Sequence, residues 1–252
     1  MTKQSGLGQN FYLDGVDLSG DTGSASRIGG GLATVLPVPG INDLAQSRIG
    51  GGRDGGITWQ SWFNPAAGQA HPTISTLPTG DRLATWVHRP VLGVAAACVV
   101  AKQINYDGQR EANANFPFTI ETQGNAFGLE WTEQLTAGYD TLTGAAAGSG
   151  LDYGALIATT AFGLQAYLQA FTFAGTSATV AVQHSDDNGA GDAYANVTGA
   201  VFTAVSAAPG SQRIQTARNA SVKRWLRINV TGTFSDLTLG VFVVKNLTNT
   251  VF

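Results

Sequence analysis

The sequence predicts an all-β protein with one short helix. Apolar and polar residues alternate with a period of two in several segments, as in strands that bury one face. Glycine is abundant, at 33 of 252 residues, and clusters of turn-forming residues separate the alternating segments. A hydrophobic content of 43% is sufficient for a core and excludes a disordered chain.

The helix is expected within residues 64–78. Pro65 follows Asn64, an arrangement that suits a helix start, and Pro72 and Pro78 enclose a second candidate. The closely spaced prolines limit either helix to a turn or two. Beyond it, residues 94–100 form an apolar run, and the single cysteine within that run is expected to be a small buried hydrophobe.

Two strands are predicted in the middle of the chain. Residues 116–123 alternate so that Phe116, Phe118 and Ile120 share one face. Residues 127–135 continue the alternation and predict an apolar face and a polar face. The apolar face comprises Leu129, Trp131 and Leu135, and the polar face comprises Glu130, Thr132 and Gln134.

Residues 143–150 are rich in glycine and alanine and predict a flexible linker between two β domains, residues 1–142 and 151–252. The first domain has eight basic and twelve acidic residues, a net charge of −4, whereas the second has six basic and five acidic residues. The overall charge of −3 therefore originates in the N-terminal domain. One β domain with a long loop is the alternative division.

Three further strands are predicted in the second domain, at residues 178–184, 222–230 and 237–244. Residues 231–236 form a cluster of turn residues between the last two strands, which predicts a hairpin.

Patterns for catalysis are missing from the sequence. The three histidines, His71, His88 and His184, form no metal-ligand spacing, and no GxSxG nucleophile motif occurs. Glu130 and Glu133 are three residues apart and would face opposite sides of a strand. The glycine-rich segments lack the Lys-Ser/Thr of a phosphate-binding loop. We expect no enzyme, no cofactor and no metal site.

Two segments allow a second interpretation. Residues 185–192 are acidic, but Ala190 and Val197 occupy positions that an EF-hand fills with ligands, so a plain turn is favoured over a weak divalent-cation site. Lys223, Trp225 and Arg227 share one strand face, as in a nucleic-acid stacking platform. The small number of charges favours instead a strand whose cationic stems cover the tryptophan at a subunit contact.

The chain lacks an N-terminal apolar segment, and its longest apolar stretch, residues 91–101, is too short to span a membrane. We expect a soluble protein without a membrane partner. The low charge, the β pattern and the absence of cofactor motifs are typical of a self-assembling structural protein.

One internal repeat is present. The six residues Ser-Arg-Ile-Gly-Gly-Gly at 26–31 recur at 47–52. Such glycine-rich segments have high backbone freedom, so they are expected to order against a partner or to lie where backbones approach closely.

Several segments together resemble the major tail proteins, or tail tube proteins, of bacteriophages with long non-contractile tails. In the first half these segments are residues 17–21, 57–63 and 101–108, the last leading into the strand at 116–123. In the second half they are residues 162–169, 183–189 and 222–228.

The resemblance implies a tail-tube-type β-sandwich or barrel followed by a second, C-terminal β-sandwich. It implies homo-oligomeric, hexameric rings that stack into a hollow tube in the virion, contact other phage tail proteins and are assembled in the host cytoplasm. Viral DNA would pass through the tube without specific binding, past an acidic lumen that repels phosphate. On this basis Glu121 and Glu130 are expected to line the lumen.

The same resemblance gives a role to the glycine-rich loops at residues 29–40 and 42–56, which would order across contacts between rings. The residues expected there are Arg27, Ile28, Gly29, Gly30, Gly31, Arg48, Ile49, Gly50, Arg53 and Asp54.

Two other functions are compatible with the sequence. A baseplate or tail-tip binding module could recognise a host surface glycan through Trp225, Tyr167 and Tyr194, because aromatic faces stack on sugars. A capsid decoration protein is the third possibility.

Overall fold

The computed structural model describes residues 5–154, 157 and 159–249 of the chain. It is almost entirely β, and α1 (Ala70–Ile74) is the one α-helix among these residues. The prediction of an all-β fold with one short helix is confirmed. The outermost residues of the two predicted domains, 1–4 and 250–252, lie outside the described residues.

The chain divides into two compact units that interleave along the sequence. Unit 1 contains the described residues of Met1–Gly20, Leu83–Cys98 and Trp131–Val251, and unit 2 contains Asp21–Arg82 and Val99–Glu130. The sequence predicts instead one boundary within residues 143–150. That segment contains a short strand that pairs with the last strand of unit 1, so it is part of a sheet. Local composition does not reveal such pairing, because the partner lies far away in the sequence.

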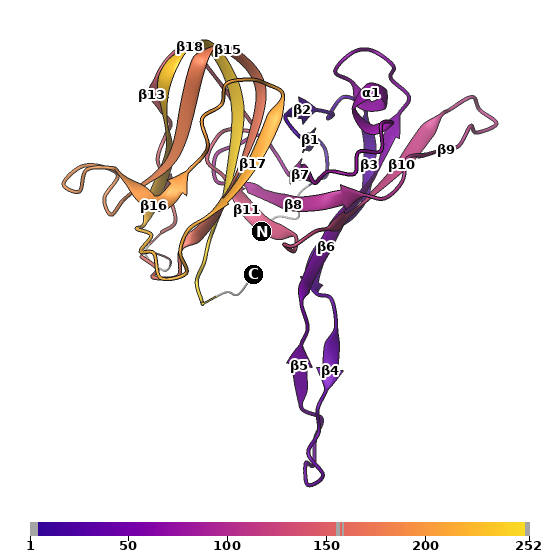
Figure 1. The fold of residues 1–252 in the computed structure, drawn as a ribbon, viewed down its shortest axis with the longest axis horizontal. Coiled ribbons are helices and arrows are strands. Elements are labelled where there is room, and N and C mark those ends of the chain that lie inside the picture. Colours follow the sequence, from indigo (N-terminus) through magenta and orange to yellow (C-terminus); the bar gives the residue numbers. More distant parts are fainter. Residues whose placement is uncertain (1–4, 155–156, 158, 250–252) are drawn as a thin grey trace. The chain divides into compact units, whose positions relative to one another are not determined.

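Unit 1 is built around two very long antiparallel strands, β15 and β18, whose ladder extends from Leu164↔Lys245 to Ser185↔Trp225. Strands β12, β13 and β14 pair with β18, and β16 and β17 pair with β15 (Figure 1). The elements that lie wholly or partly in unit 1 are β1 (Asn10–Leu13), β2 (Val16–Asp17), β7 (Arg82–Val87), β8 (Ala95–Gln103), β11 (Glu130–Gln134), β12 (Asp140–Leu142), β13 (Ala146–Ala147), β14 (Leu151–Asp152), β15 (Leu164–Ser185), β16 (Ala195–Val201), β17 (Gly210–Gln215) and β18 (Trp225–Lys245).

Strands β15 and β18 bend together at glycines. Gly175 has φ 155° and Gly232 has φ 130°, a region that side-chain-bearing residues rarely adopt. A Cβ on Gly232 would lie 2.2 Å from the carbonyl oxygen of Ser177. The hairpin turn predicted at residues 231–236 is therefore wrong: β18 continues through this segment as a bulged bend paired with β15.

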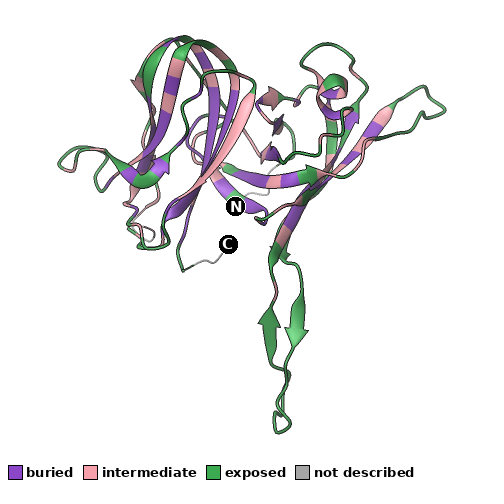
Figure 2. Ribbon diagram, in the orientation of Figure 1, coloured by how far each residue is buried: buried purple, intermediate pink, exposed green. Residues whose placement is uncertain are grey.

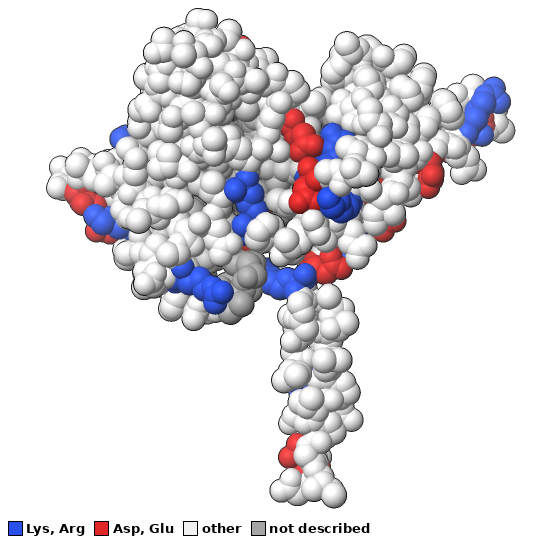
Figure 3. All heavy atoms as spheres, in the orientation of Figure 1, with Lys and Arg blue, Asp and Glu red and all other residues white. Residues whose placement is uncertain are grey.

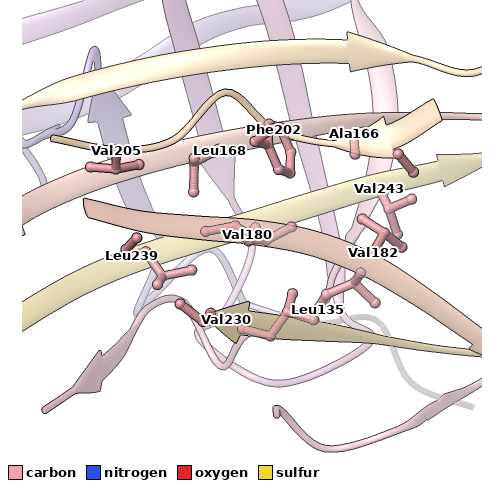
Figure 4. Packing of buried hydrophobic residues seen from close by; sticks show 14 of the residues in the cluster. Leu135, Ala166, Leu168, Val180, Val182, Phe202, Val205, Val230, Leu239 and Val243 are labelled. Carbon is pink, nitrogen blue, oxygen red and sulfur yellow. The ribbon is translucent and has the colours of Figure 1, made fainter. Parts of the chain in front are cut away.

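The bend lets both halves of the ladder pack on one core. Ala166 and Leu168 precede the bend of β15, and Val180 and Val182 follow it, yet all belong to a single buried cluster. Figure 4 shows these side chains together with Phe202 and with residues of β18. Burial of aliphatic side chains at about 25 cal/mol per Å² is the main stabilisation of such a core.

The face predicted for residues 127–135 is only partly confirmed: Leu129 and Leu135 are buried, but strand β11 between them turns the other way. Glu130, Thr132 and Gln134 are buried, whereas Trp131 is 54% exposed. Gln134 finds its partners inside: its Nε2 donates to the carbonyl oxygens of Arg89 and Val94 at 2.7 and 3.0 Å. Its Oε1 accepts from the Gly138 N–H at 3.0 Å. Satisfied hydrogen bonds let the polar face occupy the interior.

Unit 2 is a sheet in which β10 lies beside β6, and β6 beside β3 (Figure 1). In β10, Phe118 and Ile120 are buried as predicted, but Phe116 precedes the strand and is exposed. The buried face of the sheet is packed with Ile57, Trp59 and the helix residue Ile74, whose carbonyl oxygen accepts from Gln103 Nε2 at 2.9 Å. The elements introduced here are β3 (Thr22–Leu32), β4 (Val35–Pro37), β5 (Arg48–Gly50), β6 (Arg53–Trp62), β9 (Asp107–Gly108) and β10 (Pro117–Gly124).

Candidate functional site

Unit 2 carries a long β-hairpin arm, residues 30–53, that continues the β3–β6 ladder beyond the rest of its sheet (Figure 1). Strands β4 and β5 pair within the arm, and the Val38 N–H donates to the Ser47 carbonyl oxygen at 2.8 Å. At the tip, the Gly40 N–H donates to Asp43 Oδ2 at 2.6 Å and closes the turn. The arm is thus a regular antiparallel ribbon.

Every residue from 30 to 50 is exposed, and Figure 2 shows this part of the hairpin in green throughout. The two tip residues Ile41 and Leu44 are 108% and 105% exposed. The arm carries few charged residues, and Figure 3 shows an almost uncharged surface along its length. The other exposed large apolar side chains of the arm are Leu32, Val35, Leu36, Val38 and Ile49.

An apolar arm of this kind costs free energy when it is exposed to water without a partner. A two-stranded ribbon has no layer over either face and is marginally stable when isolated. Contiguous exposed apolar surface usually marks an interaction site. The sequence interpretation missed these side chains, although apolar residues spaced through a loop-like segment between two glycine repeats were a signal for an exposed contact surface.

The structure places the predicted inter-ring residues in strands, which corrects their assignment to loops. Residues 27–31 lie in β3 and pair with β6, whereas residues 48–50 lie in β5 and pair with β4. The two copies of the repeat thus occupy opposite strands of one hairpin. Of the repeat glycines, Gly30 serves close packing at the base of the hairpin, since a Cβ there would lie 2.8 Å from the Cβ of Leu129. The contact between rings stays a prediction.

Unit 2 also has an open polar sheet face next to the base of the arm. On β6 and β10, the residues opposite the buried face are half-buried or exposed. In the antiparallel register Thr58 lies across from Glu121, and Gln60 across from Thr119. The members of this open face are Ser24, Arg27, Asp54, Thr58, Gln60, Lys102, Asp107, Thr119, Glu121 and Gln123.

The open face has a weakly acidic character. Asp54 accepts from Gln123 Nε2 at 3.2 Å, and Asp107 accepts from Asn105 Nδ2 at 2.8 Å. Lys102 is paired with Asp81 at 2.8 Å, so its charge is offset on the same surface. Asp54 and Asp107 were not expected on this face from the sequence, because the register of β6 against β10 decides it.

The two predicted lumen residues have different surroundings. Glu121 lies half-buried on the open face. Glu130 is only 3% exposed, because β11 turns this side chain inward. The expectation that Glu130 lines a lumen as a solvated carboxylate is therefore wrong for this chain.

The basic cluster of unit 1 is neutralised by its neighbours. The Lys223 ammonium donates to both carboxylate oxygens of Asp192, at 2.7 and 2.6 Å. Arg224 makes a two-pronged contact with Asp152 at 2.6 and 2.7 Å. These cations hold the pKa values of both aspartates below the usual range. Lys223 and Arg224 are thus ion-paired, whereas Arg227 donates to the amide oxygen of Gln183 at 3.0 Å.

Residues 185–192 form the favoured plain turn. The Asp187 carboxylate accepts from the backbone N–H groups of Gly191 and Asp192 at 2.6 to 3.1 Å, which lowers its pKa. Across residues 5–249, leaving aside 155, 156 and 158, no three His, Cys, Asp or Glu side chains gather closely enough to hold a metal ion.

The aromatic residues predicted for glycan binding do not form one surface. Tyr167 is fully buried in the core of unit 1. The Arg227 guanidinium lies 3.9 Å from the centroid of the Tyr194 ring and covers that face. Within the described part of the chain, no helix is long and apolar enough to cross a bilayer.

Comparison with known proteins gives a distant similarity at the level of structure. No protein-family model matches the chain, and no curated protein matches it. Among solved structures, the chain is similar to the SPP1 Dit (gp 19.1) protein, described as a paradigm of the hub adsorption apparatus in phages that infect Gram-positive hosts. The alignment covers 95% of this chain and 99% of that chain, with 11% sequence identity and a TM-score of 0.34.

Proposed function

We propose that this chain is a non-enzymatic structural subunit that assembles with copies of itself into the tail tube of a phage with a long non-contractile tail. The single observation that carries the proposal is the apolar arm, residues 30–53, which no layer formed by the described residues covers. Burying this surface against another copy would remove the cost of exposing it to water.

The size of the arm fits this role. A stable protein–protein interface draws on about 20 to 30 residues from each partner, and residues 30–53 reach that range. The β3 strand adds a second route to association, since it ends the strand order of its sheet and pairs only with β6 among the described strands. Unpaired edge strands accept a strand from another chain.

The open face suits the wall of a DNA conduit. Its hydroxyl, amide and carboxylate groups are half-buried or exposed, and its three carboxylates outnumber its two cations, Arg27 and the paired Lys102. Negative charge on such a surface repels phosphate and keeps DNA from binding during its passage. In this proposal Glu121, Asp54 and Asp107 face the lumen, and Glu130 does not.

The baseplate module that recognises a glycan is the alternative. Burial of Tyr167 and coverage of Tyr194 by Arg227 leave only Trp225 of its proposed stacking residues, which favours the tube.

The decisive experiment is negative-stain electron microscopy with sedimentation velocity on the full chain over a range of concentrations. We expect rings or hollow tubes from the unmodified protein. Replacing the exposed tip residues, Ile41→Asp with Leu44→Asp, should reduce assembly at least tenfold without lowering the melting temperature. Val201→Asp in β16 is the matched control, because it charges an exposed apolar residue of unit 1, which does not contain the arm.

Two results would count against the proposal. A wild-type chain that stays monomeric at every concentration, including in the presence of preformed tail tips, excludes self-assembly into a tube. Normal tubes from the double arm variant would show that assembly does not depend on the arm.

A further inference from the structure

Unit 2 has a second uncovered apolar surface, an aromatic cluster at the end of β6 away from the arm. The cluster comprises Phe63, His71, Tyr106, Phe116 and Phe118. Tyr106 and Phe118 are stacked with ring centroids 4.3 Å apart, and Phe116 meets Phe118 edge-on at 4.7 Å. The centroid of Phe63 lies 5.6 Å from that of Phe116 and 4.7 Å from that of His71.

The cluster is rigid at its centre and open at its surface. His71 Nδ1 and the Tyr106 hydroxyl are 3.0 Å apart, within hydrogen-bond distance. Within the cluster, Phe118 is buried, whereas Phe63 and Phe116 are 43% and 39% exposed. Two large aromatic side chains are thus presented to solvent on a support that fixes their positions, which is typical of the anchor residues of interfaces.

The arm and the aromatic cluster lie at opposite ends of the same strand. The arm joins β6 at Arg53, and Phe63 directly follows the last residue of β6, Trp62. Ten residues of strand separate the two surfaces by roughly 30 Å. One copy cannot bring its own arm onto its own cluster without breaking the β3–β6 ladder.

We propose that the aromatic cluster of one copy receives the arm of the next copy. This inference rests on the proposed function and names the receiving surface for the arm. The occupant is a second copy because this chain itself supplies an apolar element of matching character that is equally uncovered.

The placement makes the contact directional. Because two different surfaces meet, every added copy offers a new arm and a new cluster, and association is head to tail. Such contacts produce closed rings or continuing tubes, whereas contacts between two arms would stop at a dimer.

The test is site-specific photo-crosslinking in the full chain. The photoreactive residue p-benzoylphenylalanine replaces Ile41, and irradiated assemblies are digested and mapped by mass spectrometry. We expect crosslinks from the arm to residues 62–63, 71 or 104–118 of another copy. The same probe at Val201 is the control and should give no crosslink to the cluster.

A pair of variants provides an independent readout. Phe116→Asp should reduce assembly at least tenfold, to the level of the double arm variant, while Tyr139→Asp, which changes an exposed aromatic residue of unit 1, should assemble normally. Circular dichroism and melting temperature confirm that both variants are folded.

Different failures are distinguishable. Crosslinks between two arms, crosslinks to another surface, or no crosslinks in samples that form tubes would overturn the head-to-tail contact and leave the tube proposal intact. Normal tubes from Phe116→Asp would do the same. A wild-type chain that never assembles would overturn both.

Discussion

The side-chain oxygen of Gln169 accepts a hydrogen bond of 2.6 Å from the backbone N–H of Gly15, 154 positions earlier in the chain. The Nε2 of the same glutamine donates to the Leu83 carbonyl oxygen at 3.0 Å and to Thr85 Oγ1 at 2.9 Å. A single buried amide in β15 therefore joins the β1–β2 turn and β7 to the C-terminal ladder of unit 1.

Gln169→Leu should destabilise the protein by about 2–4 kcal/mol. The substitution keeps the volume but leaves the Gly15 N–H unsatisfied, which costs about 1–3 kcal/mol. It also removes the hydrogen bonds to Thr85 Oγ1 and to the Leu83 carbonyl, which keeps the Asp14 N–H, at about 1 kcal/mol each. Urea unfolding followed by fluorescence measures the change. Gln109→Leu, at an exposed position, is the control and should shift stability by less than about 0.5 kcal/mol. An equally small effect at Gln169 would contradict the bridging role.

Gly232→Ala should destabilise unit 1 by at least about 2 kcal/mol. Its backbone conformation is strained for any other residue, and the new Cβ would meet the Ser177 carbonyl oxygen at 2.2 Å. Gly144→Ala provides the comparison, because nothing lies within 4 Å of its added Cβ. Thermal melting of both variants tests the prediction, and equal melting temperatures would show that the bend tolerates a side chain.

Glu133→Gln should stabilise the protein at neutral pH but not at pH 4. Burial raises the pKa of Glu133 above its usual 4.5, against the opposing effects of Tyr153 and Lys245. The folded state then binds its proton more tightly than the unfolded state does. Wild-type stability from this group is complete below pH 4.5 and is lost as pH rises through the folded pKa.

Urea midpoints of both proteins between pH 4 and pH 8 measure this difference. The advantage of the glutamine variant should grow with pH across that window. A difference that does not vary with pH would show that the Glu133 carboxyl titrates alike in the folded and unfolded states.

Glu121→Lys and Glu130→Lys should differ strongly in their effect on the free energy of unfolding. Glu121 is on the open face, so its reversal should change the free energy of unfolding by less than about 0.5 kcal/mol. Glu130 is buried, and an introduced ammonium there should cost at least about 3 kcal/mol. Urea unfolding compares the two variants.

In assembled tubes, Glu121→Lys should also increase cosedimentation with double-stranded DNA, because it removes a repelling charge and adds an attracting one. Salt should reverse this increase. DNA binding equal to that of the wild type would place Glu121 outside the lumen.

The sequence by itself determined the fold class, because a period of two, abundant glycine and closely spaced prolines are local properties that permit strands and only one short helix. It also determined the buried face of β10 and the burial of Cys98, where apolar side chains decide the outcome without a partner. The tertiary structure decided which face of β11 is inside, since the hydrogen bonds of Gln134 come from residues 89, 94 and 138.

The tertiary structure also decided that residues 231–236 continue a strand, because β15 supplies a ladder through the bend. It also placed the two glycine repeats on opposite strands of one arm, since strand register depends on pairing between distant segments. Local sequence encodes the tendency of a segment to be a strand. Which strand pairs with that segment, and hence which surface the segment exposes, is decided by the whole chain.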